Sequence, residues 1–161
     1  SGEIVELWGR AVLARDAAHA RLLGMMERGE SLPDWTRYPA FYASPTETPD
    51  GQVVGSIGPT TSKRMDSYLA AFGERGIFPL TIGKGERAAV CAQTCARYGS
   101  AYLAAIGGAA ALAASRYVSS CETIDWPELG MEAVRLVEFS GLPVLVAVDS
   151  KGEDYYRGLV P

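Results

Sequence analysis

The stretch PLTIGKGERAAVCAQTCARYGSAYLAA (79–105) indicates the fold class of this chain. Residues 79–82 form a short apolar run typical of a strand, and the run ends in Gly83-Lys84-Gly85. Residues 87–98 have the composition of a helix, and residues 101–105 are apolar again. Strands that alternate with helices in this way predict an α/β domain.

The segments on either side continue the alternation. We expect further strands at 4–14, 40–43, 52–57, 118–124, 134–139 and 144–148, and further helices at 16–28, 62–73 and 109–117. A length of 161 residues suits one domain with a sizeable core. We therefore expect a single α/β domain over residues 1–161.

The composition argues against several classes of partner. The net charge is −4, whereas a nucleic-acid-binding face is usually basic. The longest apolar segment, around residues 101–114, is interrupted by glycines, so no membrane span and no signal peptide are predicted. We expect a soluble protein that binds neither nucleic acid nor membrane.

Three cysteines are present, at Cys91, Cys95 and Cys121. An odd number without regular spacing predicts no disulfide framework and suits the reducing cytoplasm. Cys91 and Cys95 lie four apart in an alanine-rich helical pattern, so they share one helix face. With only His19 as a further soft ligand, buried thiols are favoured over a metal site, and we expect this chain to bind no metal.

Three predicted strand-to-helix junctions each carry a cation. Arg15 follows the first strand, Arg64 follows the segment Gly58-Pro59-Thr60-Thr61, and Lys84 lies between two glycines. Ligands of open α/β sheets bind outside the carboxyl ends of strands, and helix N-termini favour anions. Because an arginine can grip a carboxylate with two parallel hydrogen bonds, these cations suit a small dicarboxylate. Nearby cations would favour deprotonation of the hydroxyl of Thr60 or Thr61.

Each of these features also has a plainer interpretation. Arginine and lysine in a first helical turn are often only solvated, and Thr60-Thr61 could simply cap a helix. His19 is more often a packed helix residue than a catalytic one. The Gly83-Lys84-Gly85 segment lacks the spacing of a phosphate-binding P-loop, so no nucleotide site is predicted.

Six motifs carry a resemblance to a known family. They are ARDAAH (14–19), GPTTSKRMDSY (58–68), GKGER (83–87), YLAAIGG (102–108), PELGMEAV (127–134) and DSKGEDYY (149–156). The chain resembles the C-terminal domain of class I, iron–sulfur-dependent fumarate hydratases. The same domain occurs as the β subunit of two-chain fumarases and L-tartrate dehydratases. The resemblance covers nearly the whole chain, with the motifs in order.

The resemblance implies a swivelling β/β/α domain of three layers, docked on a larger N-terminal domain or α subunit. That partner would hold a [4Fe-4S] cluster, and the cluster-binding domain would lie outside these residues. The chain itself would bind no cofactor and be inactive alone, and the full enzyme would be a homodimer in the cytoplasm.

Site roles follow from the resemblance by motif. Arg15, Arg64 and Lys84 match residues that bind the substrate carboxylates. Thr60 matches the proposed acid/base at carbon, and Thr61 is its neighbour in the pocket. The implied reaction is the reversible addition of water to fumarate or a close relative such as mesaconate.

The chain departs from the usual family pattern near these motifs. Ser62-Lys63 replaces Ala-Gly, Glu86 replaces Asn, and Ser44 replaces Gly. Lys63 and Glu86 lie beside the matched cations, so fumarate, mesaconate and tartrate all remain open as substrates. A non-catalytic dicarboxylate-binding module and a dimerisation domain are the alternatives from other functional classes.

Overall fold

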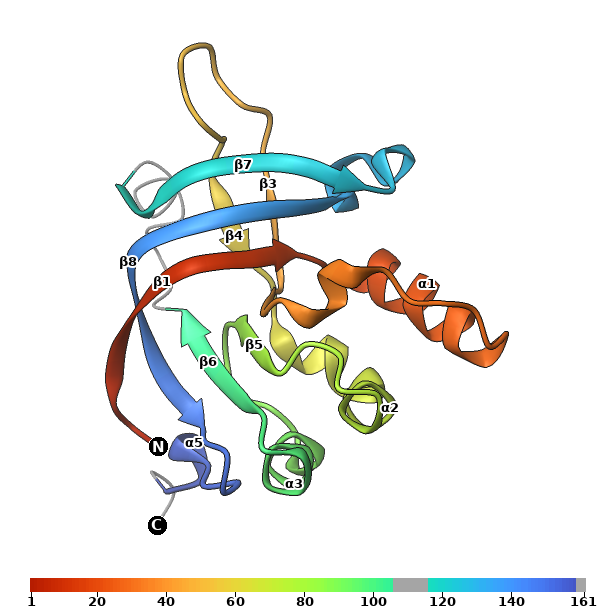
Figure 1. Cartoon of the computed structure of the whole chain (residues 1–161). Helices are drawn as coiled ribbons and strands as arrows, with labels where there is room; N and C mark the ends of the chain where they lie inside the picture. Colours follow the sequence, from red (N-terminus) through yellow and green to blue (C-terminus); the bar gives the residue numbers. More distant parts are fainter. Residues whose placement is uncertain (106–115, 159–161) are drawn as a thin grey trace.

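The computed structural model describes residues 1–105 and 116–158. It confirms a mixed α/β domain, shown in Figure 1. The strands are β1 (Ile4–Leu13), β2 (Ala40–Phe41), β3 (Ala43–Pro45), β4 (Ile57–Pro59), β5 (Leu80–Gly83), β6 (Ala101–Ala105), β7 (Val118–Asp125) and β8 (Val134–Val148). The helices are α1 (Asp16–Glu27), α2 (Leu69–Glu74), α3 (Ala89–Tyr98) and α5 (Tyr155–Gly158), with 3-10 helices η1 (Asp34–Arg37), η2 (Ser62–Tyr68) and η3 (Pro127–Glu132).

The main sheet closes on itself through its longest strand. Its order is β1-β2-β5-β6-β8-β7, and β1 also pairs with β8 along its whole length. The strands β1, β2 and β5 run parallel to one another, as do β5 and β6. The two ends of β8 pair with different strands: its first half lies against β7 and its second half against β6. A separate two-stranded sheet, β3 with β4, forms a hairpin beside the closed sheet.

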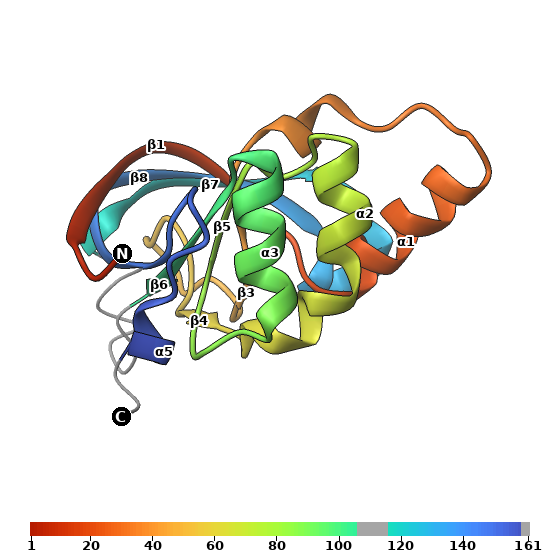
Figure 2. The same ribbon diagram turned by 90° about the horizontal axis from the view of Figure 1, so that it is seen from below.

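Helices α1, α2 and α3 lie together on one side of the closed sheet (Figure 2). Adjacent residues of β1 serve the two sides: Leu13 packs inside the closed sheet with Ile82 and Val137, whereas Val12 packs with Leu22 and other residues of the helical side. This alternation follows from the two-residue period of a strand. Within the described residues, no helix is long and apolar enough to cross a membrane.

Most predicted elements are confirmed to within a few residues, but three predictions need correction. The strand expected at 52–57 is wrong, since only Ile57 belongs to a strand there. A Cβ on Gly55 would lie 2.4 Å from the carbonyl oxygen of Glu47, so the chain folds closely back on itself instead of extending.

The other two corrections concern a helix and a strand. The helix expected at 62–73 begins as the 3-10 helix η2 and becomes α-helical only at Leu69. The strands expected at 134–139 and 144–148 are one continuous strand, because β8 passes through Gly141 at a positive φ of 77° and keeps pairing with β1 across a bulge. The helix expected at 109–117 falls largely outside the described residues.

Candidate functional site

The parallel strands β1, β2 and β5 end side by side, and two of the predicted site residues follow those ends. Arg15 comes two residues after the end of β1, and Lys84 directly follows β5. Backbone hydrogen bonds join the three ends: Ala14 N donates to Phe41 O at 3.2 Å, and Tyr42 N donates to Ile82 O at 2.8 Å. The edge is therefore the one at which α/β sheets bind ligands.

The backbone places Thr60 and Thr61 at the same edge. Thr60 N donates to Tyr42 O at 2.7 Å, Thr61 pairs with Lys84 in a parallel bridge, and Ser62 N donates to Lys84 O at 3.1 Å. Thr60 is half-buried, whereas Thr61 and Lys84 are exposed. The two hydroxyls and the lysine thus lie on adjacent segments that are fixed to each other through the main chain.

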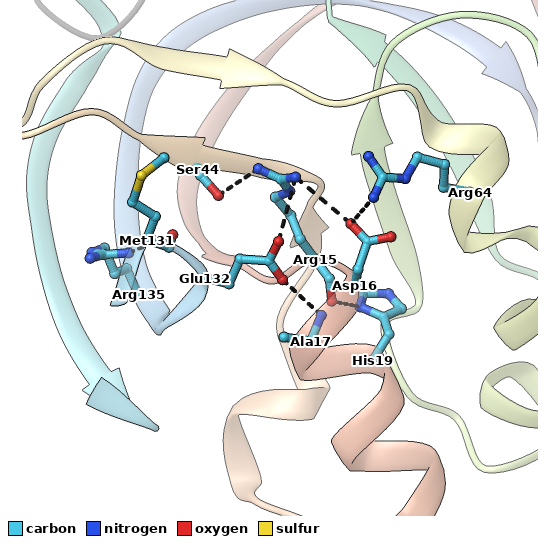
Figure 3. Close-up of polar contacts among 9 residues, drawn as sticks. All are labelled: Arg15, Asp16, Ala17, His19, Ser44, Arg64, Met131, Glu132 and Arg135. Carbon is cyan, nitrogen blue, oxygen red and sulfur yellow. Dashed lines mark hydrogen bonds and ion pairs between the residues drawn. The ribbon is translucent and has the colours of Figure 1, made fainter. Parts of the chain in front are cut away.

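Asp16, the first residue of α1, joins the two predicted arginines. Its Oδ2 lies 3.0 Å from Arg64 Nη2 and 3.7 Å from Arg15 Nη2 (Figure 3). Both contacts are ion pairs rather than hydrogen bonds, since Asp16 Oδ2 has no hydrogen-bond partner among the described residues. Arg64 remains more than half exposed, at 55%. Arg15 and Arg64 are therefore brought together through a shared carboxylate.

Two further residues hold Arg15 from distant parts of the chain. Ser44, on β3, accepts a hydrogen bond from Arg15 Nη1 at 2.9 Å. Glu132, at the end of η3, places Oε1 3.5 Å from Arg15 Nη2, and its Oε2 accepts from Ala17 N at 2.8 Å. Figure 3 shows Ser44, Asp16 and Glu132 around the Arg15 guanidinium. Neither partner was predicted, because no sequence spacing links residues 44 and 132 to residue 15.

His19 lies beneath this group and is neutral. Its Nδ1 contacts Arg15 O at 2.8 Å, and a carbonyl only accepts, so Nδ1 carries the proton. The ring is 1% exposed and packs against Tyr42, Tyr68, Phe72 and Phe78. Burial lowers the pKa of His19 to about 4, despite its hydrogen bond to Arg15 O and the nearby Asp16. The plainer interpretation of His19 as a packed helix residue therefore fits the structure.

A buried polar layer supports the Gly83-Lys84-Gly85 segment. The Tyr102 hydroxyl donates to Gly85 O at 2.8 Å and lies 3.1 Å from Ser62 Oγ. Arg87, buried between the rings of Tyr42 and Tyr102, pairs through Nε with Asp66 Oδ1 at 2.5 Å. Ser62, which replaces an alanine of the usual family pattern, therefore has a structural role directly below the segment that carries Lys84.

The cysteines do not gather into a ligand set. Cys91 and Cys95 are buried free thiols on α3, whereas Cys121 lies on β7. Within residues 1–105 and 116–158, no group of three or more histidine, cysteine, aspartate or glutamate side chains could hold a metal ion. The described residues therefore do not fit an iron–sulfur cluster.

The fold and this edge define the class of protein: an α/β domain with two arginines, a lysine and a hydroxyl pair at one edge of its sheet. Comparison with known families makes the class specific. The family model described as fumarase C-terminus matches residues 1–159. The chain belongs to this family.

Several curated proteins are similar to the chain. Fumarate hydratase 2 of Leishmania major is 42% identical over 156 residues, which are 96% of the chain and 28% of that protein. The aerobic class I fumarate hydratase of Escherichia coli is 40% identical, with 95% of the chain and 28% of that protein covered. The chain thus spans less than a third of the fumarate hydratases it matches. The L(+)-tartrate dehydratase subunit beta of Escherichia coli is 32% identical, with 95% of the chain and 77% of that subunit covered.

Proposed function

We propose that this chain is the substrate-binding and acid/base half of a [4Fe-4S] hydro-lyase. The enzyme would reversibly hydrate fumarate to malate, or a close dicarboxylate such as mesaconate to the corresponding hydroxy acid. One observation carries the proposal: in a chain of the fumarase family, Arg15, Arg64, Lys84 and the pair Thr60-Thr61 all lie at the edge where β1, β2 and β5 end.

In this proposal the cations bind the two carboxylates and Thr60 moves the proton at carbon, with Thr61 beside it. Loss of a proton next to a carboxylate builds negative charge on that carboxylate in the transition state. A cation fixed at that position stabilises the transition state more than the ground state, which is the requirement for catalysis. The main-chain link between Thr61 and Lys84 supports this role, because it holds a hydroxyl pair and a cation in one arrangement.

The cluster belongs to a partner in this proposal. The class I fumarate hydratases are iron–sulfur-dependent, and the cysteines of this chain lie apart on α3 and β7. A cluster-bearing N-terminal domain or α subunit would cover the site. When bound there, the cluster would polarise the substrate hydroxyl as a Lewis acid. The free thiols suit a reducing compartment, and we place the enzyme in the cytoplasm as a homodimer. The swivelling three-layer arrangement would let the domain dock on its partner.

L-tartrate dehydratase is the second candidate. The chain is 32% identical to the L(+)-tartrate dehydratase subunit beta of Escherichia coli, over 95% of the chain. Tartrate carries two hydroxyls where malate carries one, and Lys63 and Glu86 lie in the segments that carry Arg64 and Lys84. These exposed residues are the positions at which we expect the substrates to be distinguished.

The proposal is tested with the enzyme assembled from this chain and its cluster-bearing partner under anaerobic conditions. We expect the assembly to hydrate fumarate or mesaconate, or to dehydrate tartrate, and the chain alone to do none of these. Thr60→Ala should lower kcat by about 10²–10⁴-fold, the usual loss of a general acid or base, and leave substrate binding nearly intact. Thr48→Ala, in the exposed loop of the β3–β4 hairpin, is the matched control and should leave kcat unchanged.

Two results would contradict the proposal. Turnover by the isolated chain would show that no partner is needed. An unchanged kcat in the Thr60→Ala enzyme would remove this hydroxyl from the chemistry and favour a dicarboxylate-binding module without catalysis.

A further inference from the structure

Glu132 occupies an unusual position between Arg15 and the first turn of α1. Its two carboxylate oxygens have different partners: Oε1 faces Arg15 Nη2 at 3.5 Å, and Oε2 accepts from Ala17 N at 2.8 Å. Ala17 N is one of the first amides of α1, which have no partner within the helix, and the preceding Arg15 makes no side-chain cap. Glu132 therefore supplies from a distant segment the cap that α1 lacks locally.

The backbone on either side of Glu132 is itself fixed by Arg135. Arg135 Nη1 donates to Met131 O at 3.1 Å (Figure 3). It also donates to Ala133 O at 3.3 Å, and Nη2 donates to Gly130 O at 3.1 Å. These three bonds bracket the turn that presents Glu132. The carboxylate is thus held in place by main-chain contacts rather than carried on a freely moving loop.

Arg15 is held on both sides as a result. Ser44 Oγ accepts from Nη1, while Glu132 and Asp16 place carboxylates near Nη2. The Arg15 side chain is 19% exposed. An arginine binds a carboxylate well only when its planar donors are aimed in advance, since each immobilised side chain otherwise costs binding free energy.

We infer that Glu132 is a positioning residue for Arg15: held by Arg135, it fixes the direction in which the guanidinium faces the substrate carboxylate. This inference rests on the proposed function. Glu132 itself contacts no substrate. The negative charge of Glu132 also opposes substrate binding, because a carboxylate so near Arg15 competes with the substrate carboxylate for the same cation. We expect alignment to outweigh competition, since Glu132 is bound to α1 and Arg135 fixes its backbone, so substrate does not have to displace it.

The test replaces Glu132 by glutamine in the assembled enzyme. Glutamine keeps an oxygen that can accept from Ala17 N but removes the charge that holds Arg15. We expect KM for the dicarboxylate to rise about tenfold, in line with the loss of a charge-assisted contact, and kcat to change much less. A purely structural role would instead lower the melting temperature and the amount of active enzyme while leaving KM unchanged.

Glu128→Gln is the matched control. Glu128 lies on the same 3-10 helix and pairs with Arg21, away from the arginines of the site. It should keep the wild-type KM. Arg135→Lys is a second variant for the case in which Glu132→Gln does not fold: lysine keeps the charge but loses the planar fork, so KM should rise by a smaller factor.

The outcomes separate this inference from the proposed function. An unchanged or lower KM in Glu132→Gln, with an active wild type, overturns the positioning role; a lower KM would mean that Glu132 competes with the substrate. If the wild-type assembly turns over none of the three dicarboxylates, the proposed function fails. The inference is then decided by calorimetry, which compares the binding of fumarate to the wild type and to Glu132→Gln. Weaker binding by the variant supports it, and equal binding or no binding to either protein overturns it.

Discussion

At the scale of single residues, the site balances its charges before any ligand arrives. Arg15 and Arg64 are matched by Asp16 and Glu132, so the four side chains together are neutral. Lys84 and the exposed face of Arg64 remain directed outward from this group. A pairing of this kind reduces the repulsion between the two guanidinium groups, and it leaves the attraction for a dianion to the more exposed cations.

Local sequence signals predicted some of these residues and could not predict others. Arg15, Arg64, Lys84 and Thr60 stand out because each follows a predicted strand. Asp16 joins both arginines, but its place in the first turn of α1 indicates only a favourable interaction with the helix dipole. Ser44 and Glu132 reach Arg15 only because β3 and η3 fold beside α1, and such contacts between distant segments leave no trace in local spacing.

His19 makes a prediction about stability and pH. Its folded-state pKa of about 4 lies below the ordinary value of 6.5, so the unfolded chain binds more protons between these values. The free energy of unfolding should therefore keep its neutral-pH value above pH 6.5 and decrease as the pH is lowered toward 4. The loss should amount to about 3 kcal/mol over this window.

Urea denaturation at several pH values between 4 and 7.5 measures the effect. The comparison is His19→Asn, whose amide can donate to Arg15 O but does not titrate. The variant should be less stable at neutral pH, yet show a shallower dependence on pH in this window. The N-terminal amine lowers the pKa of Asp149 to about 2, so Asp149 acts mainly below pH 4; it is present in both proteins, and its effect therefore cancels in the comparison. Parallel curves for both proteins would show that His19 is not the titrating group.

At the scale of elements, the close approach of η2 to β5 sets the geometry of the site. A Cβ on Gly83 would lie 1.9 Å from Ser62 Oγ and 3.2 Å from Tyr42 Cδ2. Only glycine allows the segment carrying Thr60 and Thr61 to pair with Lys84 so tightly. The glycine before Lys84 is thus required by packing.

Gly83→Ala should destabilise the protein by about 1–3 kcal/mol, the usual cost of overpacking. Chemical denaturation measures the change. Adding Ser62→Ala should recover part of the loss, because the closest contact is the Ser62 hydroxyl. Gly58→Ala, on the neighbouring strand β4 and with open space around its Cβ position, is the control and should change stability by less than about 0.5 kcal/mol. Equal losses from Gly83→Ala and Gly58→Ala would refute the packing argument.

Element prediction succeeded where local pattern and tertiary structure agree. The strand and helix on either side of Arg15 are confirmed, since β1 and α1 follow clear apolar runs and helix formers. The 3-10 helix η2 was expected as an α-helix because its composition suits both, and only its contacts with β5 and α1 decide between them. The unbroken β8 was missed because Gly141-Leu142-Pro143 resembles a turn, whereas pairing with β1 carries the strand through it.

At the scale of the whole molecule, β1 and β8 hold the sheet closed. β1 pairs in parallel with β2 on one side and antiparallel with β8 on the other. The interior contains Leu13, Phe41, Ile82, Val137 and Val144 from four different strands. Since the same strand β1 leads directly into Arg15, opening of the sheet would also separate the residues of the site. Stability of the sheet and order of the site are therefore coupled.

Leu13→Ala tests this coupling. Leu13 is 1% exposed at the end of β1, so its truncation should lower the free energy of unfolding by about 2–5 kcal/mol. Far-ultraviolet circular dichroism and tryptophan fluorescence should shift together in one transition, because loss of this contact weakens the closed sheet as a unit. Ile4→Ala, on the same strand and of the same side-chain size, is 64% exposed and should cost less than about 1 kcal/mol. Leu13→Ala could instead unfold in two separate transitions, with the fluorescence of Trp35 beside α1 changing at a different denaturant concentration from the circular dichroism of the sheet. That result would show that the helical side folds independently of the closed sheet.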